Sequence, residues 1–383
     1  MNGDMTRISR ESYRKATVEA LTVREAVDFL EREAKVRTLR EKLEKFSKGR
    51  DLSKLLVAGL LEHHPDMKKD SVERRVRGWL KPEPGHSIKK QDAIEVAFIL
   101  ELDVDEADEF VTLVSEERLH WRNPDEIVYI FALQNGMSYQ TAVKLAGQME
   151  GILSQVQETR ELEEDSFTPM IRSQLSQLST VEELQDYLLH AVGRLGRCHN
   201  NAYQMFLDMM DALENPEIDE VEADMFGEER LTVRDIVREY FYEDNVLYAK
   251  SNARKTQKGK AGEEEWCILT KIQESIASSW PDEIAISRMK SRKMDVSRKI
   301  LILLFLATDE EWKETGEDVF EDMYRRMNDM LGLCGFSTLD PRVPFDWLII
   351  YCMCVTDILD MDDRMHRIFN EMFGMDPKAG GKA

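Results

Sequence analysis

The sequence predicts an all-α fold, made of two related multi-helix units joined by a helical, acidic middle region. Apolar residues recur at three- and four-residue spacing, which is the period of an amphipathic helix, and the alternating pattern of a strand is nearly absent. Three helix starts of the form Thr-x-x-acid, at Thr22, Thr180 and Thr232, combine a capping hydroxyl with a carboxyl group that can return to the cap. The length of 383 residues allows two or three compact domains.

Charge divides the chain into segments of opposite character, although the formal net charge is −22. Residues 1–90 carry 22 basic and 15 acidic side chains, and residues 251–300 carry 11 and 7. Residues 91–250 carry 11 basic and 35 acidic side chains, and residues 301–383 carry 8 and 17. The acidic segments repel nucleic acid, so any contact with phosphate has to come from the two basic segments.

Composition and spacing predict five segments in chain order. The N-terminal segment reads as one or two amphipathic helices with dense mixed charge, which is typical of a solvated arm. Two polar stretches, 155–177 and 251–262, are predicted linkers. The segments are a charged helical arm at 1–50, a first compact unit at 51–146, an acidic helical middle region with linkers at 147–262, a second unit at 263–374 and a disordered tail at 375–383.

The two units end in the same way when positions 220 residues apart are compared. Proline is preorganised for the first turn of a helix, and an acid two residues later favours the positive end of the helix dipole. We therefore predict an internal duplication, with Pro124 and Pro344 each in the first turn of an equivalent helix. The matching pairs are Leu119 and Leu339, Arg122 and Arg342, Pro124 and Pro344, Glu126 and Asp346, Ile130 and Ile350, and Phe131 and Tyr351, with Pro65-Asp66 and Pro281-Asp282 upstream.

The first unit contains Ser71-Val-Glu-Arg74-Arg75-Val-Arg77-Gly78-Trp79-Leu80, then a loop, an apolar helix over 88–100 and the ending at 119–133. This arrangement resembles the Xre/Cro repressor-like helix-turn-helix family, in variants that have an extra C-terminal helix after an Arg-x-Pro turn. The resemblance covers roughly half the chain. It implies a helix-turn-helix (HTH) unit in which residues 71–80 are the DNA recognition helix. The second unit has Ile286-Ser-Arg288-Met-Lys290-Ser-Arg292-Lys293 in that place and lacks the Gly-Trp ending, so it resembles a diverged copy.

Candidate DNA contacts follow from this resemblance and from helical spacing. A recognition helix presents polar side chains to base edges while neighbouring Lys and Arg bind phosphates. Arg74 and Arg77 are three residues apart and share a helical face. The candidates in the first unit are Lys68, Lys69, Ser71, Arg74, Arg75, Arg77, Lys81, Lys89 and Lys90, and a possible second set is Arg288, Lys290, Arg292 and Lys293.

Enzyme signatures are absent from the sequence. It has no phosphate loop, dinucleotide fingerprint, nucleophile elbow, H-E-x-x-H or kinase signature set. Cys352 and Cys354 stand two apart in a helical run and so point to different faces, and the acidic clusters lack the spacing of a calcium loop. We therefore expect a non-catalytic protein with no cofactor and no metal.

The expected compartment is the cytoplasm. No apolar run approaches the roughly 20 residues that span a bilayer, and the longest runs, 300–307 and 348–355, predict buried helices. The first residues lack the apolar core of a signal peptide, and five scattered cysteines suit a reducing environment. No membrane partner is expected.

Two functions remain open at this stage. The first is a regulatory protein that binds double-stranded DNA through its first unit, while the remainder mediates self-association or binds a protein partner. The alternative is a protein–protein adaptor or scaffold whose HTH-like units no longer bind DNA, which the net charge of −22 favours. A DNA-binding unit is expected to gather the basic side chains on an exposed face free of carboxylates, whereas an adaptor is expected to expose apolar or acidic patches there.

Overall fold

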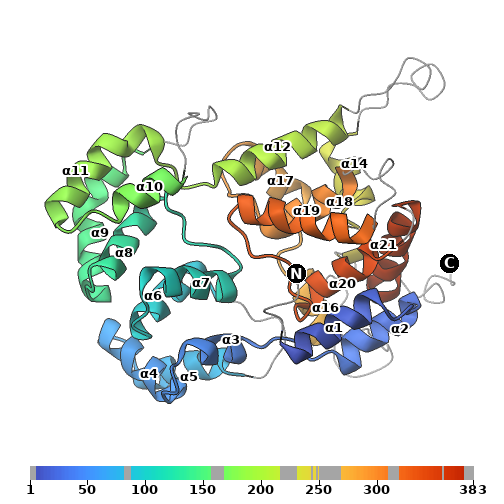
Figure 1. Cartoon of the computed structure of the whole chain (residues 1–383), viewed down its shortest axis with the longest axis horizontal. Helices are drawn as coiled ribbons and strands as arrows, with labels where there is room; N and C mark the ends of the chain where they lie inside the picture. The colour runs from blue at the N-terminus through green and yellow to red at the C-terminus, as the bar shows by residue number, and fades with distance from the viewer. Residues whose placement is uncertain are drawn as a thin grey trace, which may run out of the picture.

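Helices make up all the regular secondary structure of the described chain. The computed structural model describes residues 6–81, 88–156, 168–215, 231–242, 245–246, 249, 269–308, 319–355 and 358–374. Within these ranges the only β contact is an isolated antiparallel bridge between Glu117 and Phe336. The predicted all-α fold is therefore confirmed. The helices form two bodies that lie side by side (Figure 1).

The first body, at the left of Figure 1, is built around one apolar core that includes the fully buried Phe110, Phe131 and Leu56. Its helices run antiparallel or across one another and are joined by short turns. They are α3 (Leu39–Phe46), α4 (Leu52–His63), α5 (Lys69–Trp79), α6 (Lys90–Ile99), α7 (Val104–Ser115), α8 (Pro124–Gln134), α9 (Tyr139–Leu153), α10 (Thr168–Leu175) and α11 (Val181–Ala191), followed by the 3₁₀ turn η2 (Val192–Arg194).

The second body has a separate and larger core, with Trp347, Tyr351 and Phe369 at its centre. It combines the C-terminal half of the chain with the N-terminal helices. The elements are α1 (Arg7–Thr17), α2 (Val23–Asp28), the π-helical turn η1 (Phe29–Glu33), α12 (Asn200–Glu214), α14 (Val233–Glu239), α16 (Lys271–Ala277), α17 (Glu283–Lys290), α18 (Arg298–Thr308), α19 (Val319–Leu333), α20 (Pro344–Met353) and α21 (Ile358–Phe373).

The N-terminal segment is helical, as predicted, but it is not a solvated arm. Figure 1 shows α1 and α2 lying against α20 and α21 at the far end of the chain. The indole N–H of Trp347 donates to the carbonyl oxygen of Ser12 at 2.9 Å, and the Tyr351 hydroxyl donates to that of Leu21 at 2.9 Å. Large aromatic side chains on α20 need cover and polar partners, and α1 and α2 supply both. The remainder of the 1–50 segment, including α3, belongs to the first body.

The middle region does not form a layer of its own. Its helices α10 and α11 bury Leu175, Leu184 and Leu188 in the first core, whereas α12 and α14 bury Phe206 and Ile236 in the second. The predicted linker at 155–177 contains α10 in its described part. The second linker at 251–262 and the tail at 375–383 lie outside the described residues.

The predicted helix starts are confirmed. Thr22, Thr180 and Thr232 each form a capping box with the acid three residues later. Pro124 and Pro344 are the first residues of α8 and α20. The two long apolar runs lie in α18 and α20, which are largely buried. In the described part of the chain, no helix combines the length and the apolar character needed to cross a bilayer.

Close packing of α4 on α6 generates the first prediction. A Cβ atom on Gly59 would lie 2.6 Å from Cγ2 of Ile99, so Gly59→Ala should destabilise the protein by about 1–3 kcal/mol through overpacking. The matched control is Gly147→Ala on α9, where the added Cβ meets no atom within 4 Å. That change should stabilise the helix by about 0.5–1 kcal/mol. Urea unfolding of both variants is the measurement, and equal unfolding midpoints would contradict the packing argument.

Candidate nucleic-acid interface

The helix predicted to read DNA lies on the outside of the first body, packed across α4. Val72 and Val76 are one turn apart on α5 and are buried in the first core, which fixes the opposite face of the helix outward. The turn from α4 to α5 is held from below. His63 Nδ1 and His64 Nε2 lie 3.1 and 2.8 Å from the same oxygen of Glu95, whose side chain is buried on α6. These two histidines therefore anchor the turn.

The candidate residues of the first unit fall into two groups. Seven of the nine lie at or near the surface: Ser71 is half-buried, and Lys68, Lys69, Arg74, Arg77, Lys81 and Lys89 are exposed. The other two, Arg75 and Lys90, are engaged inside the unit. Arg75 pairs with Asp92 at 2.6 Å and stacks over the ring of Trp79. Lys90 is only 14% exposed and pairs with Glu126 at 2.9 Å, so both side chains hold α5 and α6 in place.

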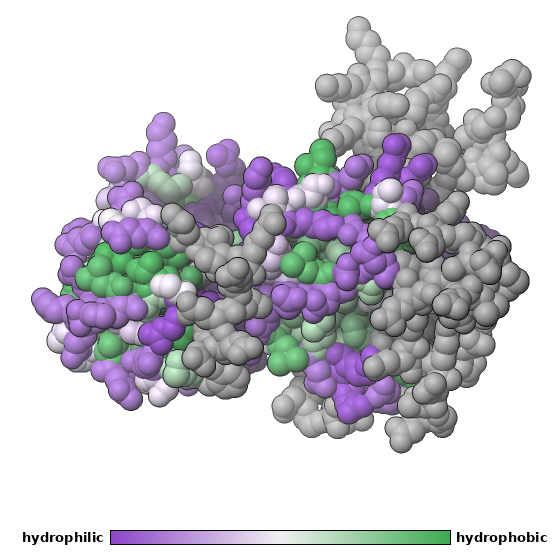
Figure 2. All heavy atoms as spheres, turned by 90° about the horizontal axis from the view of Figure 1, so that it is seen from above, coloured by the Kyte–Doolittle hydropathy of each residue, from purple (hydrophilic) through white to green (hydrophobic). Residues whose placement is uncertain are grey.

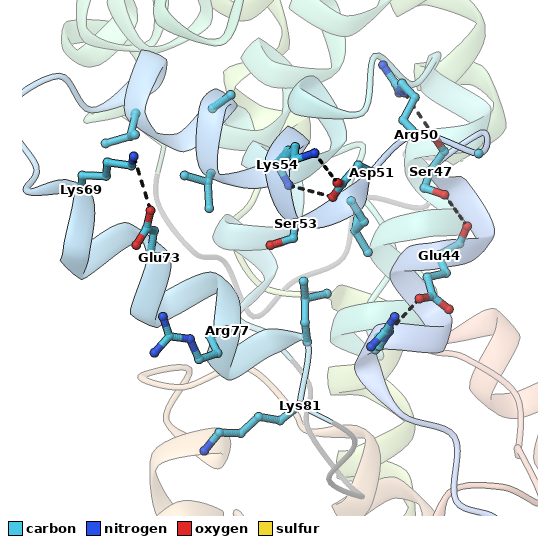
Figure 3. A pocket seen from close by; sticks show the side chains of 17 residues that line it. Glu44, Ser47, Arg50, Asp51, Ser53, Lys54, Lys69, Glu73, Arg77 and Lys81 are labelled. Atoms are coloured by element: carbon cyan, nitrogen blue, oxygen red, sulfur yellow. Dashed lines mark hydrogen bonds and ion pairs between the residues drawn. The ribbon is translucent and has the colours of Figure 1, made fainter.

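A groove of about 1210 Å³ runs between α3, α4 and α5 (Figure 3). Six basic side chains line it against three acidic ones. Each acid is paired with a base on its own helix: Glu44 with Arg40, Asp51 with Lys54, and Glu73 with Lys69. The remaining basic side chains are Arg50, which pairs with Glu101 outside the groove, and Arg77 and Lys81 at its lower end.

This face is not free of carboxylates, which departs from the simplest expectation for a DNA-binding unit. The carboxylates are nevertheless matched by adjacent bases, so the groove as a whole has an excess of positive charge. Arg40, Arg50 and Lys54 were not among the sequence candidates, because they come from α3 and α4 and reach this groove only through the tertiary fold. Their position one helix away from α5 carries no local sequence signal.

The second set of candidates is arranged differently. The corresponding helix, α17, ends at Lys290, so Arg292 and Lys293 lie in the turn after it. Lys290 pairs with Glu214 of α12 at 2.6 Å, and Arg292 stacks 4.1 Å above the ring of Tyr203. Arg288 and Lys293 are the exposed members of this set. The second unit therefore uses two of its four candidates to bind its own helices.

A cavity of about 1180 Å³ separates the two bodies near their junction. Lys42 of α3 lies in its wall, is 5% exposed, and has no ion pair or hydrogen bond from its amine to any described residue. Burial lowers the pKa of this amine. The cavity is otherwise lined by nearly balanced charges, including the buried pair of Arg298 and Asp346 with 2.8 Å contacts. Balanced, mutually satisfied charges give it no preference for an anion or a cation.

Two histidines close the junction between the bodies. The rings of His120, in the turn before α8, and His199, before α12, lie 3.9 Å apart. Burial lowers the pKa of both, that of His199 to about 3. The backbone N–H of His199 donates to Asp295 at 3.1 Å, and burial raises the pKa of this carboxyl to about 6. Lys90 and Arg122 are the nearest cations and also disfavour a charged His120.

Among the described residues, no group of three or more His, Cys, Asp and Glu side chains could hold a metal ion. The histidine pair therefore reads as part of the junction between the bodies. Comparison of the chain with models of protein families, with curated proteins and with solved structures gives no match. Inferences about function depend on the geometry alone.

The buried histidine pair predicts how stability depends on pH. The unfolded chain protonates histidine below about pH 6.5, whereas the folded junction keeps both rings neutral. The free energy of unfolding should therefore fall as pH decreases below 6.5. Asp295 acts in the opposite sense below pH 6, so the comparison has to isolate the histidines. Urea unfolding at pH 7.5, 6.0 and 5.0 should show a steeper loss for the wild type than for His120→Asn/His199→Asn. Parallel losses would contradict this assignment.

Proposed function

We propose that the protein binds double-stranded DNA through the first body, with α5 in the major groove and the groove beside it against the phosphate backbone. The observation that carries the proposal is the outward face of α5. Arg74 and Arg77 are exposed there, one turn apart, on a helix whose other face is fixed by Val72 and Val76. Arginine on an exposed helix can bind guanine edges in a bidentate manner.

Electrostatics supports one orientation of the complex. The chain has a net charge of −22, so its overall field repels DNA, and only a locally basic face can approach it. The face formed by α3, α4 and α5 has such an excess, and Lys68 and Lys89 extend it at the ends of α5 and α6. The remaining acidic surface then disfavours binding in other orientations.

The second body is proposed to mediate association, because its corresponding basic residues are partly engaged by α12. Lys290 is held by Glu214, and Arg292 by Tyr203 and Asn200. This assignment makes the protein an asymmetric regulator with one DNA-binding body and one body for binding to itself or to a protein partner.

The alternative, an adaptor that binds only proteins, is favoured by a different observation. Figure 2 shows apolar areas between the polar side chains on both bodies. Ile284 on α17 is 70% exposed and Leu333 at the end of α19 is 68% exposed. Exposed large apolar side chains are typical of protein-binding surfaces when they gather in a patch. The two functions differ in whether the purified protein binds DNA at all.

The DNA proposal predicts a loss of affinity when both outward arginines are removed. Arg74→Ala/Arg77→Ala should weaken binding by about 1–3 kcal/mol for each of the two side chains that reads a base. If the two side chains bind phosphates instead, the loss should be uniform across sequences and the salt dependence should become shallower. The measurement is fluorescence anisotropy with a pool of duplex fragments from the genomic neighbourhood of the coding sequence, at low and physiological salt.

The matched control is Arg32→Ala/Arg367→Ala. These two exposed arginines lie in the second body, so the control removes the same charge far from α5. It should bind DNA as the wild type does. Absence of wild-type binding at low salt, where non-specific attraction is strongest, would rule out the DNA proposal and leave the adaptor function.

A further inference from the structure

The two bodies are held together by an exchange of helix pairs. The pair α1–α2 precedes the first body in sequence but packs on α20 and α21 of the second. The pair α10–α11 precedes the helices of the second body but packs on α8 and α9 of the first. Figure 1 shows both relations, with α10 and α11 beside α8 and α9 at the left and α1 and α2 beside α20 and α21 at the right.

The two helix pairs resemble each other in sequence and in local structure. Thr22-Val-Arg-Glu-Ala-Val-Asp-Phe-Leu30 aligns without a gap with Thr180-Val-Glu-Glu-Leu-Gln-Asp-Tyr-Leu188. Both threonines form capping boxes, and both leucines are buried, Leu30 at 2% exposure and Leu188 at 0%. Each pair ends in a short non-α turn, η1 or η2, before the chain leaves for the next helix.

The same arginine binds each pair. Arg342 Nε donates to the carbonyl oxygen of Lys35 at 2.9 Å, and the backbone N–H of Arg37 donates to the carbonyl oxygen of Arg342 at 2.9 Å. Arg122 Nε donates to the carbonyl oxygen of Arg194 at 2.9 Å, and the N–H of Gly196 donates to the carbonyl oxygen of Arg122 at 3.0 Å. In both places the acceptor stands two residues before the donor.

The surroundings of the two arginines also match. The N–H groups of Leu119 and Leu339 donate to the side-chain oxygens of Asp108 and Asn328, each eleven residues earlier, at 2.9 and 2.7 Å. The N–H groups of His120 and Asp340 donate to the carboxylates of Glu126 and Asp346 at 2.7 and 2.8 Å. Those carboxylates pair with Lys90 and Arg298, which are the first residues of α6 and α18. All the matched turn positions are 220 residues apart.

The direct contact between the bodies has the symmetry that two related units would give. The bridge joins Glu117 to Phe336, and the flanking hydrogen bonds run from Arg118 N–H to the Gly335 oxygen and from Ser337 N–H to the Glu116 oxygen. Segments 116–118 and 335–337 are the same positions of the two units, displaced by about 220 residues. A segment that pairs antiparallel with its own equivalent is the signature of an isologous, two-fold contact.

We propose that the surface formed by α8 and α9 and the surface formed by α20 and α21 are equivalent docking sites for one kind of partner, the leading helix pair of the other repeat. The chain is then a single-chain dimer of two repeats, 6–156 and 168–374, whose leading pairs are exchanged. These repeats are longer than the units delimited by the shared endings, because each includes a pair that packs on the other body. Exchange of an identical element between protomers is a common route to dimers, and here both protomers lie in one chain. The inference does not depend on DNA binding.

The test uses the full chain with a specific protease site replacing residues 158–165, between the repeats. After cleavage, the halves should stay associated and co-elute in size-exclusion chromatography. Leu30→Ala and Leu188→Ala should each make the cut halves separate at least tenfold faster on dilution, because each removes buried apolar surface from one exchanged pair. Arg122→Lys and Arg342→Lys should also weaken the association, by similar factors.

The controls are Leu56→Ala and Leu303→Ala, which remove the same atoms from positions buried within one half. They should destabilise the uncut chain to a similar degree but leave the separation rate of the cut halves within about twofold of the wild type. The proposal is overturned if the halves separate on cleavage, if the control variants accelerate separation as much as Leu30→Ala and Leu188→Ala, or if only one of the two exchanged pairs affects association.

Discussion

The crossing of residues 34–38 between the bodies depends on the buried guanidinium of Arg342. Its Nε donates to the Lys35 oxygen, its Nη2 contacts Glu41 at 2.8 Å, and its own carbonyl accepts from Arg37. A planar, permanently charged group that holds several acceptors in one geometry fixes the path of the chain more strongly than a flexible ammonium would. With this segment fixed, α1 and α2 are committed to the second body and α3 to the first.

The exchange explains why the two bodies form one molecule despite separate cores. Each core is completed by helices from the other side of the chain, so neither half can leave without exposing the apolar face of a helix pair. The stacked histidines and the bridge between Glu117 and Phe336 then lie at a junction that the exchanged pairs hold closed. The basic face of α3, α4 and α5 stays on the outer side of the first body, away from this junction (Figure 1).

The sequence predicted local structure better than the assignment of helices to cores. Capping boxes at Thr22, Thr180 and Thr232, and helix starts at Pro124 and Pro344, depend on interactions within four residues and were predicted correctly. The packing of α1 and α2 was not predicted, because their contacts with Trp347 and Tyr351 join residues more than 300 positions apart. The same limit applies to the basic face. Arg74 and Arg77 could be found from helical spacing, whereas the pairing of Arg75 with Asp92 and the approach of Arg40 and Lys54 are tertiary.

The most direct test of the exchanged architecture is native-state hydrogen exchange of the uncut chain carrying Leu30→Ala, mapped by peptide mass spectrometry. Leu30 stands in the N-terminal quarter of the sequence but in the core of the second body. Amides of α20 and α21, over 300 residues away, should lose protection, while those of α4 to α9 keep theirs. Loss of protection in α4 to α9 with α20 and α21 unchanged would show that the leading pair belongs to the body it precedes, and would contradict the account.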